Sequence, residues 1–159
     1  MPSASMTLKE KILAAFEGVP HPGDDNIASV DTRHPEYRRY ALHFKGRQWT
    51  QVDLVEAREM HGALNAFTPE AFHYFLPAFM LASLESYDIY DLIPESIRVD
   101  LEYVGAHRKH FPVRMAQFSK EQKRVITEFL REMERRGAGS SEDAIGYLNE
   151  DPEEQAPQP

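Results

Sequence analysis

One stretch of the sequence constrains the fold more than any other: residues 71–84 are almost all apolar or small. Just before it, Thr68 can cap a helix, Pro69 suits the first helical position, and Glu70 lies near the positive end of the helix dipole. A helix that is apolar all round has no face for solvent, so it must be buried. Its 14 residues are too few to span a bilayer, which takes about 20. We therefore expect Phe72–Leu84 to form a buried central helix.

Other helices are indicated by caps and by apolar residues spaced three or four apart. Thr7 with Glu10, and Ser119 with Gln122, form capping-box patterns. The expected helices cover 7–17, 51–65, 95–104, 120–136 and 141–148. Over 95–104 the pattern also fits a strand, and helix is the interpretation we favour.

Two segments are expected not to be helical. Tyr40, Leu42 and Phe44 alternate with more polar residues, which is typical of a strand over 37–44. Residues 105–118 are expected to form a loop that Pro112 interrupts.

Together these patterns predict a mainly α fold, an irregular bundle of about five or six helices around the central one, with at most a small β element near 37–44. A chain of 159 residues suffices for one domain with a proper core. We expect a single helical domain over 7–149, with disordered tails at 1–6 and 150–159.

Composition limits the setting in which such a chain would work. It has no cysteine, which excludes disulfides and thiolate metal sites and favours a reducing cytosol. No basic segment followed by an apolar run begins the chain, so we expect no secretory signal, no membrane segment and a cytoplasmic location. The net charge is −8, of which the residues after Arg136 carry −6, and this acidity argues against general nucleic-acid or membrane binding.

The candidate catalytic residues are His61, Glu70 and His73. The two histidines lie on consecutive predicted helices, and Glu70 is one turn before His73, so an antiparallel pairing of the helices would bring all three together. A buried histidine beside a carboxylate can act as a base. The alternative is a polar network in the core without catalysis.

Two further patterns have simple alternatives. His107 and His110 have a spacing that could hold a metal, but Arg108 and Lys109 between them would repel a cation, so a solvated basic loop is favoured and no metal or cofactor is expected. Basic and aromatic residues alternate over 33–49, as in single-strand nucleic-acid surfaces, yet the aromatic residues also suit a core.

Four motifs carry a resemblance to a known family: Ala15-Phe16, the run from Phe44 to Trp49 (F-x-G-x-x-W), the block from Thr68 to Ala78 (TPEAF-x-Y-x-LPA), and Gln122 with Phe129-Leu130. Over roughly residues 10–131 the chain resembles a family of uncharacterised bacterial proteins, a domain of unknown function. The resemblance implies a bacterial soluble protein and carries over no catalytic residue, cofactor or partner.

We therefore expect a non-enzymatic module that binds another protein, of the immunity or accessory type. Its small size, the lack of a catalytic signature and the acidic end that suits a basic partner motivate this prediction. The alternatives are a small enzyme that uses His61, Glu70 and His73, and a nucleic-acid-binding protein that uses the 33–49 segment. The sequence does not specify an oligomeric state.

Overall fold

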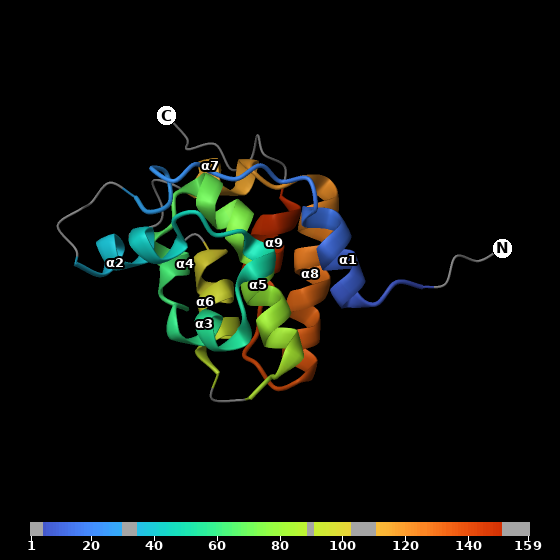
Figure 1. Ribbon diagram of the computed structural model, residues 1–159. Helices are drawn as coiled ribbons and strands as arrows, with labels where there is room; N and C mark the ends of the chain where they lie inside the picture. Colours follow the sequence, from blue (N-terminus) through green and yellow to red (C-terminus); the bar gives the residue numbers. More distant parts are fainter. Residues whose placement is uncertain (1–4, 30–34, 89–90, 103–110, 151–159) are drawn as a thin grey trace.

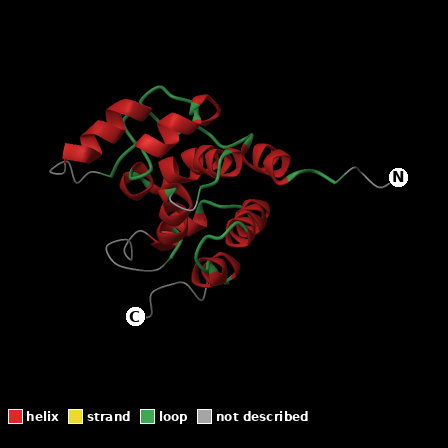
Figure 2. Ribbon diagram, turned by 90° about the horizontal axis from the view of Figure 1, so that it is seen from below, coloured by secondary structure: helices red, strands yellow, loops and turns green. Residues whose placement is uncertain are grey.

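The structure of the protein is a computed structural model that describes residues 5–29, 35–88, 91–102 and 111–150. The described residues contain helices and loops with no strand, so the predicted mainly α fold is confirmed (Figures 1 and 2). The elements are α1 (Leu8–Phe16), α2 (Pro35–Phe44), the 3-10 turn η1 (Trp49–Gln51), α3 (Leu54–Glu59), α4 (Ala63–Ala66), α5 (Pro69–Glu85), α6 (Leu92–Asp100), α7 (Phe111–Ala116), α8 (Lys120–Arg135) and α9 (Glu142–Asn149).

Helix α5 is the central helix that the sequence predicts, and it runs through the middle of the domain (Figure 1). The side chain of Thr68 accepts a hydrogen bond from the backbone N–H of Ala71, so it caps the helix as expected. Phe72, Phe79 and Met80 are fully buried. Helices α1, α3, α6 and α7 and the turn η1 all contact α5. None of the described helices is long and apolar enough to cross a membrane.

Four phenylalanines from three parts of the chain form the centre of the core. The ring of Phe75 on α5 lies 4.9 Å from that of Phe44 on α2 and 5.2 Å from that of Phe67, which ends α4. Phe79 contacts both Phe44 and Phe67, with ring centroids 6.3 Å apart in each pair. Aromatic rings at these separations attract one another in addition to the apolar area that they bury.

The predicted capping boxes set the starts of α1 and α8. Thr7 and Glu10 exchange hydrogen bonds at the start of α1, and Ser119 and Gln122 do so at the start of α8. The two helices then pack against each other. Helix α9 lies beside α8, where the sequence predicts a short last helix.

The predicted β element over 37–44 is wrong, because these residues belong to helix α2. Tyr40 and Phe44, four residues apart, are buried, while Leu42 between them is 67% exposed. The apolar residues therefore follow the helical period, and the alternation that suggested a strand includes one residue on the solvent side. The one β-like feature among the described residues is an antiparallel bridge between Ala28 and Phe67.

The helix expected over 51–65 is divided in the structure. Asp53 caps the first part, accepting a hydrogen bond from the N–H of Glu56 at 2.8 Å. A turn that contains Gly62 then separates α3 from α4. A Cβ at Gly62 would lie 2.6 Å from the hydroxyl of Tyr40, so glycine lets α2 approach this turn closely.

The loop expected over 105–118 is also corrected in its second half, where α7 begins at Phe111. Pro112 is the second residue of this helix, a position whose N–H has no helical partner, so the proline does not interrupt it. Helix is confirmed over 95–100, within α6. Residues 103–110, with His107 and His110, and most of the two expected tails lie outside the described residues.

The phenylalanine cluster gives a stability prediction. We expect Phe75→Ala to lower the free energy of unfolding by about 3–5 kcal/mol, because it removes a fully buried ring and leaves a cavity among its neighbours. Leu42→Ala, at a residue that is 67% exposed, is the matched control and should change it by less than about 0.5 kcal/mol. Urea unfolding followed by circular dichroism measures both, and equal losses would contradict the assigned core.

Candidate functional site

The three residues predicted as a catalytic group lie in different places. His61, in the turn after α3, forms a hydrogen bond between its Nδ1 and the Oγ of Ser96 on α6 at 3.1 Å. Glu70, in the first turn of α5, is exposed and accepts a long hydrogen bond of 3.5 Å from Asn26. Among the described residues, no hydrogen bond or ion pair joins any two of His61, Glu70 and His73.

His73 belongs to a polar network that joins three helices. The Nε2 of Gln122 donates to the carbonyl oxygen of Ala15 at 3.0 Å, which places its Oε1 2.8 Å from the Nε2 of His73. The same Oε1 accepts from the N–H of Ser119 at 2.9 Å. Because this oxygen can only accept, Nε2 of His73 must carry the proton. The network fixes α1 and the start of α8 against α5.

The surroundings of His73 favour its neutral form. Its ring packs against those of Phe16 and Phe118, at 6.1 and 5.1 Å between centroids. Burial lowers the pKa of His73 below its ordinary value of 6.5, although the hydrogen bond to Gln122 acts in the opposite direction. His73 therefore resembles the polar core group that the sequence allowed as the alternative to a catalytic base.

Three of the four aromatic rings in the basic and aromatic segment at 33–49 are buried, and the fourth, that of Tyr37, is half-buried. Tyr40, Phe44 and Trp49 are 7%, 0% and 6% exposed, so they cannot stack on bases as a single-strand surface requires. Arg47 is bound to Glu56, at 2.6 Å between Nη2 and Oε1. Arg33 lies outside the described residues.

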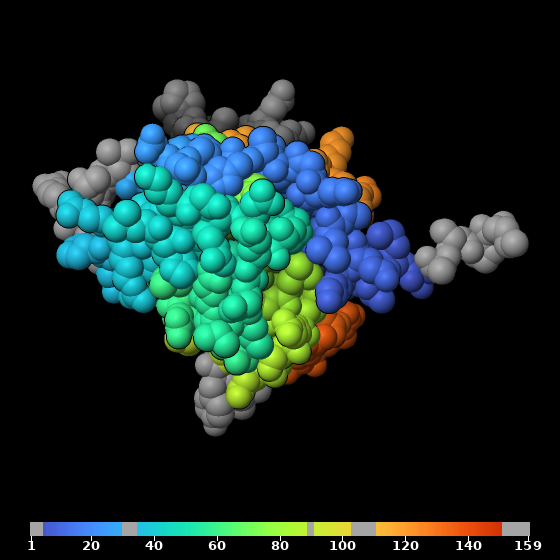
Figure 3. Space-filling model, in the orientation of Figure 1, coloured from blue at the N-terminus to red at the C-terminus, as the bar shows by residue number. Residues whose placement is uncertain are grey.

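A trough on the surface is one of the concave features in the described part of the chain. Its floor is one face of α5, formed by Ala78, Leu81, Ala82 and Glu85. Figure 3 shows the second half of α5 at the bottom of this hollow, with residues of α3 to one side and those of α1 and α8 to the other. The volume is about 780 Å³. We call this hollow, together with the neighbouring hollow along α1, the α5 trough.

A second hollow of about 690 Å³ continues the α5 trough along α1. The two hollows share Leu13, Trp49 and Thr50, so they adjoin each other, and the second hollow reaches Tyr74. From Tyr74 to Glu85 the helix rises about 16 Å, at 1.5 Å per residue. The length matches about three turns of a second helix.

The rim of the α5 trough exposes large apolar side chains. Leu13 on α1 is 38% exposed, and Val55 on α3 is 62% exposed. Leu81 and Leu84 of α5 are only partly buried. Apolar residues on a floor and on both walls form a continuous patch, which is what a binding surface for another protein or a ligand requires.

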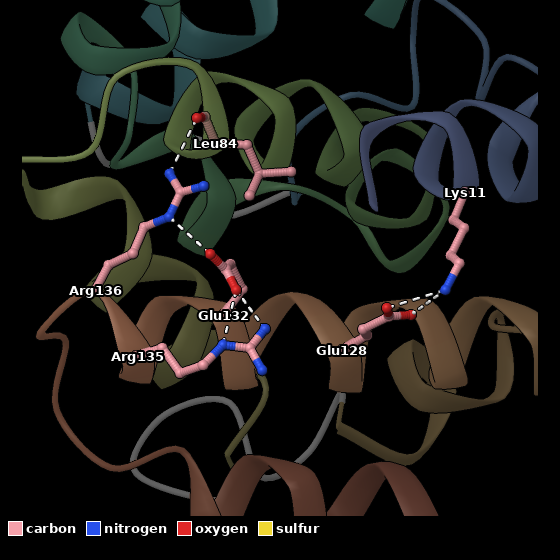
Figure 4. Close-up of polar contacts among 6 residues, drawn as sticks. All are labelled: Lys11, Leu84, Glu128, Glu132, Arg135 and Arg136. Carbon is pink, nitrogen blue, oxygen red and sulfur yellow. Dashed lines mark hydrogen bonds and ion pairs between the residues drawn. The ribbon is translucent and has the colours of Figure 1, made fainter. Parts of the chain in front are cut away.

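Ion pairs fix the charged end of the α5 trough (Figure 4). Glu132 accepts hydrogen bonds from Arg135 and from the Nε of Arg136, and these hold the pKa of Glu132 below its usual value. The Nη1 of Arg136 also donates to the carbonyl oxygen of Leu84 at 3.1 Å, which ties the end of α5 to α8. Lys11 pairs with Glu128 at 3.0 Å.

The α5 trough is not predicted from the sequence. One signal was present: Ala78 and Ala82 are four residues apart on a helix whose other faces carry large side chains. What makes the surface concave is the placement of α1 and α3 on either side, and this depends on tertiary contacts. Among the described residues, no group of three metal-binding side chains was found.

Comparisons with known proteins place the chain by sequence alone. A sequence model with the description "Family of unknown function (DUF6714)" matches residues 5–148. The expected resemblance to a family without an assigned activity is thereby confirmed, whereas the individual motifs and the bacterial origin stay predictions. No curated protein and no solved structure matches the chain.

The environment of His73 predicts a pH dependence of stability. Because the fold favours neutral His73, this histidine binds more protons in the unfolded chain than in the folded chain once the pH falls below about 6.5. The stabilisation is fully present above that pH and is lost as the pH falls toward the folded-state pKa. His73→Gln keeps a donor for Gln122 and does not titrate.

We therefore expect the free energy of unfolding to fall more steeply between pH 7 and pH 5 for the natural chain than for His73→Gln. Urea unfolding at each pH measures this free energy for both proteins. Asp100, whose pKa burial raises to about 6, titrates in both proteins, so the difference between the two profiles isolates His73. Parallel profiles would show that His73 is not held neutral.

Proposed function

We propose that this chain, which belongs to the family of unknown function described above, is a non-enzymatic protein-interaction module of the immunity or accessory type. Its binding surface is the α5 trough, and the occupant is an α-helix of a partner protein. The bacterial cytoplasm is the location that we propose for this interaction. The observation that carries the proposal is the apolar floor and rim of the α5 trough.

The shape of the α5 trough suits a helix. An amphipathic helix binds in a groove through apolar residues at positions i, i+3, i+4 and i+7, which span about two turns. The floor from Tyr74 to Glu85 is about 16 Å long, enough for three turns. Both walls are themselves made by helical elements, α1 on one side and η1 with α3 on the other.

The energetics favour occupation of the α5 trough. Covering apolar surface contributes roughly 25 cal/mol for each Å² removed from water. A single exposed leucine or valine costs little free energy. Leu13 and Val55, however, form one apolar surface together with the floor, and the apolar face of one helix would cover it. The walls need no large rearrangement, because ion pairs and hydrogen bonds already hold α1 and α8 against α5.

The proposal predicts where a partner can be crosslinked. We expect that benzoylphenylalanine, a photoreactive amino acid, placed at Leu13 or at Val55 crosslinks to one partner protein in the native host. The crosslinked segment of the partner should have apolar residues at helical spacing. The matched control is the same group at Leu42, which is 67% exposed on α2 and does not line the α5 trough. Mass spectrometry of the adducts identifies the crosslinked segment.

Two outcomes of the crosslinking would reject the proposed function. One is an adduct at Leu42 as abundant as that at Leu13, because the reaction would then report exposure alone. The other is no adduct at either trough position while the protein is folded and expressed at its natural level.

One observation favours an enzyme as a second candidate function. His61 and Ser96, whose Nδ1 and Oγ are 3.1 Å apart, line a cavity of about 410 Å³ together with Tyr40 and Asn65. A histidine that can accept the proton of a serine hydroxyl is the core of nucleophilic catalysis. This pair differs from the predicted group of His61, Glu70 and His73, of which it keeps only His61.

The enzyme candidate has a direct chemical test. An active serine would attack the phosphorus of a fluorophosphonate probe through its Oγ, with its proton taken by His61 Nδ1 and fluoride released. Labelling should then occur on Ser96, disappear in Ser96→Ala and fall strongly in His61→Gln. An unlabelled natural chain, with a known serine hydrolase labelled in the same tube, would reject this candidate.

A further inference from the structure

We propose that the helix that occupies the α5 trough is basic: it carries lysine or arginine on both flanks of its apolar face. This inference rests on the proposed function and adds the charge of the partner. The observations that carry it are the carboxylates around the α5 trough and the way in which its basic residues are already bound.

Four carboxylates line the α5 trough without a basic partner among the described residues. Glu10 lies on α1 and Glu17 directly follows this helix, Asp53 precedes α3 on the opposite wall, and Glu85 stands at the end of α5. Glu10 and Asp53 accept backbone N–H groups at the starts of their helices, which leaves their negative charge in place. The carboxylates thus occupy both walls and the end of the α5 trough at Glu85.

The basic side chains that line the α5 trough are mostly engaged. Arg135 and Arg136 are bound to Glu132, and Arg136 also to the carbonyl oxygen of Leu84 (Figure 4). Glu128 is neutralised by Lys11. In the described part of the chain, Lys9 is the one lining cation without a bound carboxylate, and Glu132 with its two arginines keeps one net positive charge. The four carboxylates therefore face two positive charges, and the α5 trough remains negative.

This charge distribution separates the occupants that the apolar floor alone would accept. A second copy of the chain carries a net charge of −8 and would be repelled. The acidic end of the chain itself, with Glu150, Asp151, Glu153 and Glu154, meets the same repulsion. A helix with cations beside its apolar stripe would place opposite charges on both rims.

Charges on a rim act mainly on the rate of association. At the edge of an interface, opposite charges steer the encounter and discriminate against wrong partners more than they add affinity. Each exposed pair is weak and is screened by salt, because the Debye length falls from about 10 Å at 0.1 M to about 3 Å at 1 M. A basic helix should therefore bind faster and tighter at low salt.

The test uses three peptides of about 18 residues, long enough to form a helix, with one leucine stripe in common and with lysine, glutamine or glutamate at the flanking positions. Fluorescence anisotropy measures their affinity for the full chain, and stopped flow measures the association rate. We expect the lysine peptide to bind tightest at low salt and its advantage over the glutamine peptide to vanish at 1 M salt.

A pair of double variants locates the effect. Glu17→Gln with Glu85→Gln removes two trough carboxylates, and Glu59→Gln with Glu142→Gln removes two exposed carboxylates elsewhere, so both variants change the net charge equally. The trough variant should weaken the lysine peptide roughly 3- to 10-fold at low salt. The control should leave its affinity within about 2-fold of the natural chain, because distant surface charges are screened.

The outcomes separate this inference from the proposed function. If the glutamate or glutamine peptide binds as tightly as the lysine peptide, or if the control variant loses as much affinity as the trough variant, the basic partner is overturned while the trough stays a binding surface.

If Ala82→Leu, which fills the floor, and Leu13→Gln, which removes an exposed rim side chain, both leave binding unchanged, the peptides do not occupy the α5 trough and the proposed function is rejected. If no peptide binds, the basic helix is overturned and crosslinking at Leu13 decides the function.

Discussion

The burial of α5 is the constraint on which the rest of the structure depends. A helix whose side chains are apolar on every side exposes them to water unless other elements surround it. Each fully buried leucine or phenylalanine contributes about 1.5–3 kcal/mol, so enclosing the helix outweighs the local preferences of the short segments around it. Helices α1, α3, α6 and α7 and the turn η1 all contact it for this reason. Among the described residues, the face of α5 that carries Ala78 and Ala82 lines the surface hollow and is the floor of the α5 trough.

Polar contacts determine where the walls of the α5 trough stand. At one end, Gln122 joins the last turn of α1 to α8 and to His73 on α5. At the other end, Arg136 binds the carbonyl oxygen of Leu84, a favourable position for a cation because the C-terminal end of a helix is negative. The two contacts fix α1 and α8 relative to α5 in the chain alone, so the proposed partner helix would meet a preformed groove. A preformed groove reduces the entropy that binding must overcome.

The parts of the fold that the sequence predicts are those decided by local chemistry. Thr7, Ser119 and Thr68 cap their helices as expected, because a capping hydroxyl and its N–H partner are only three residues apart. Errors arose where tertiary packing decided the outcome. Leu42 is an exposed leucine on α2. Because it lies between Tyr40 and Phe44, the sequence shows apolar residues at every second position, as in a strand. In the turn that divides 51–65, Tyr40 approaches Gly62 closely, a contact that no local pattern contains.

The candidate site was less predictable from the sequence than the fold, for a physical reason. A search for chemistry in a sequence finds titratable side chains, and here it found His61, Glu70 and His73. The structure binds each to a different partner, and for His73 the packing explains the histidine without any reaction. A binding groove, in contrast, is made by alanines where larger residues would fill the space and by leucine and valine on the rim. These residue types are common in every helix, so the groove becomes visible only when three helices are placed around a fourth.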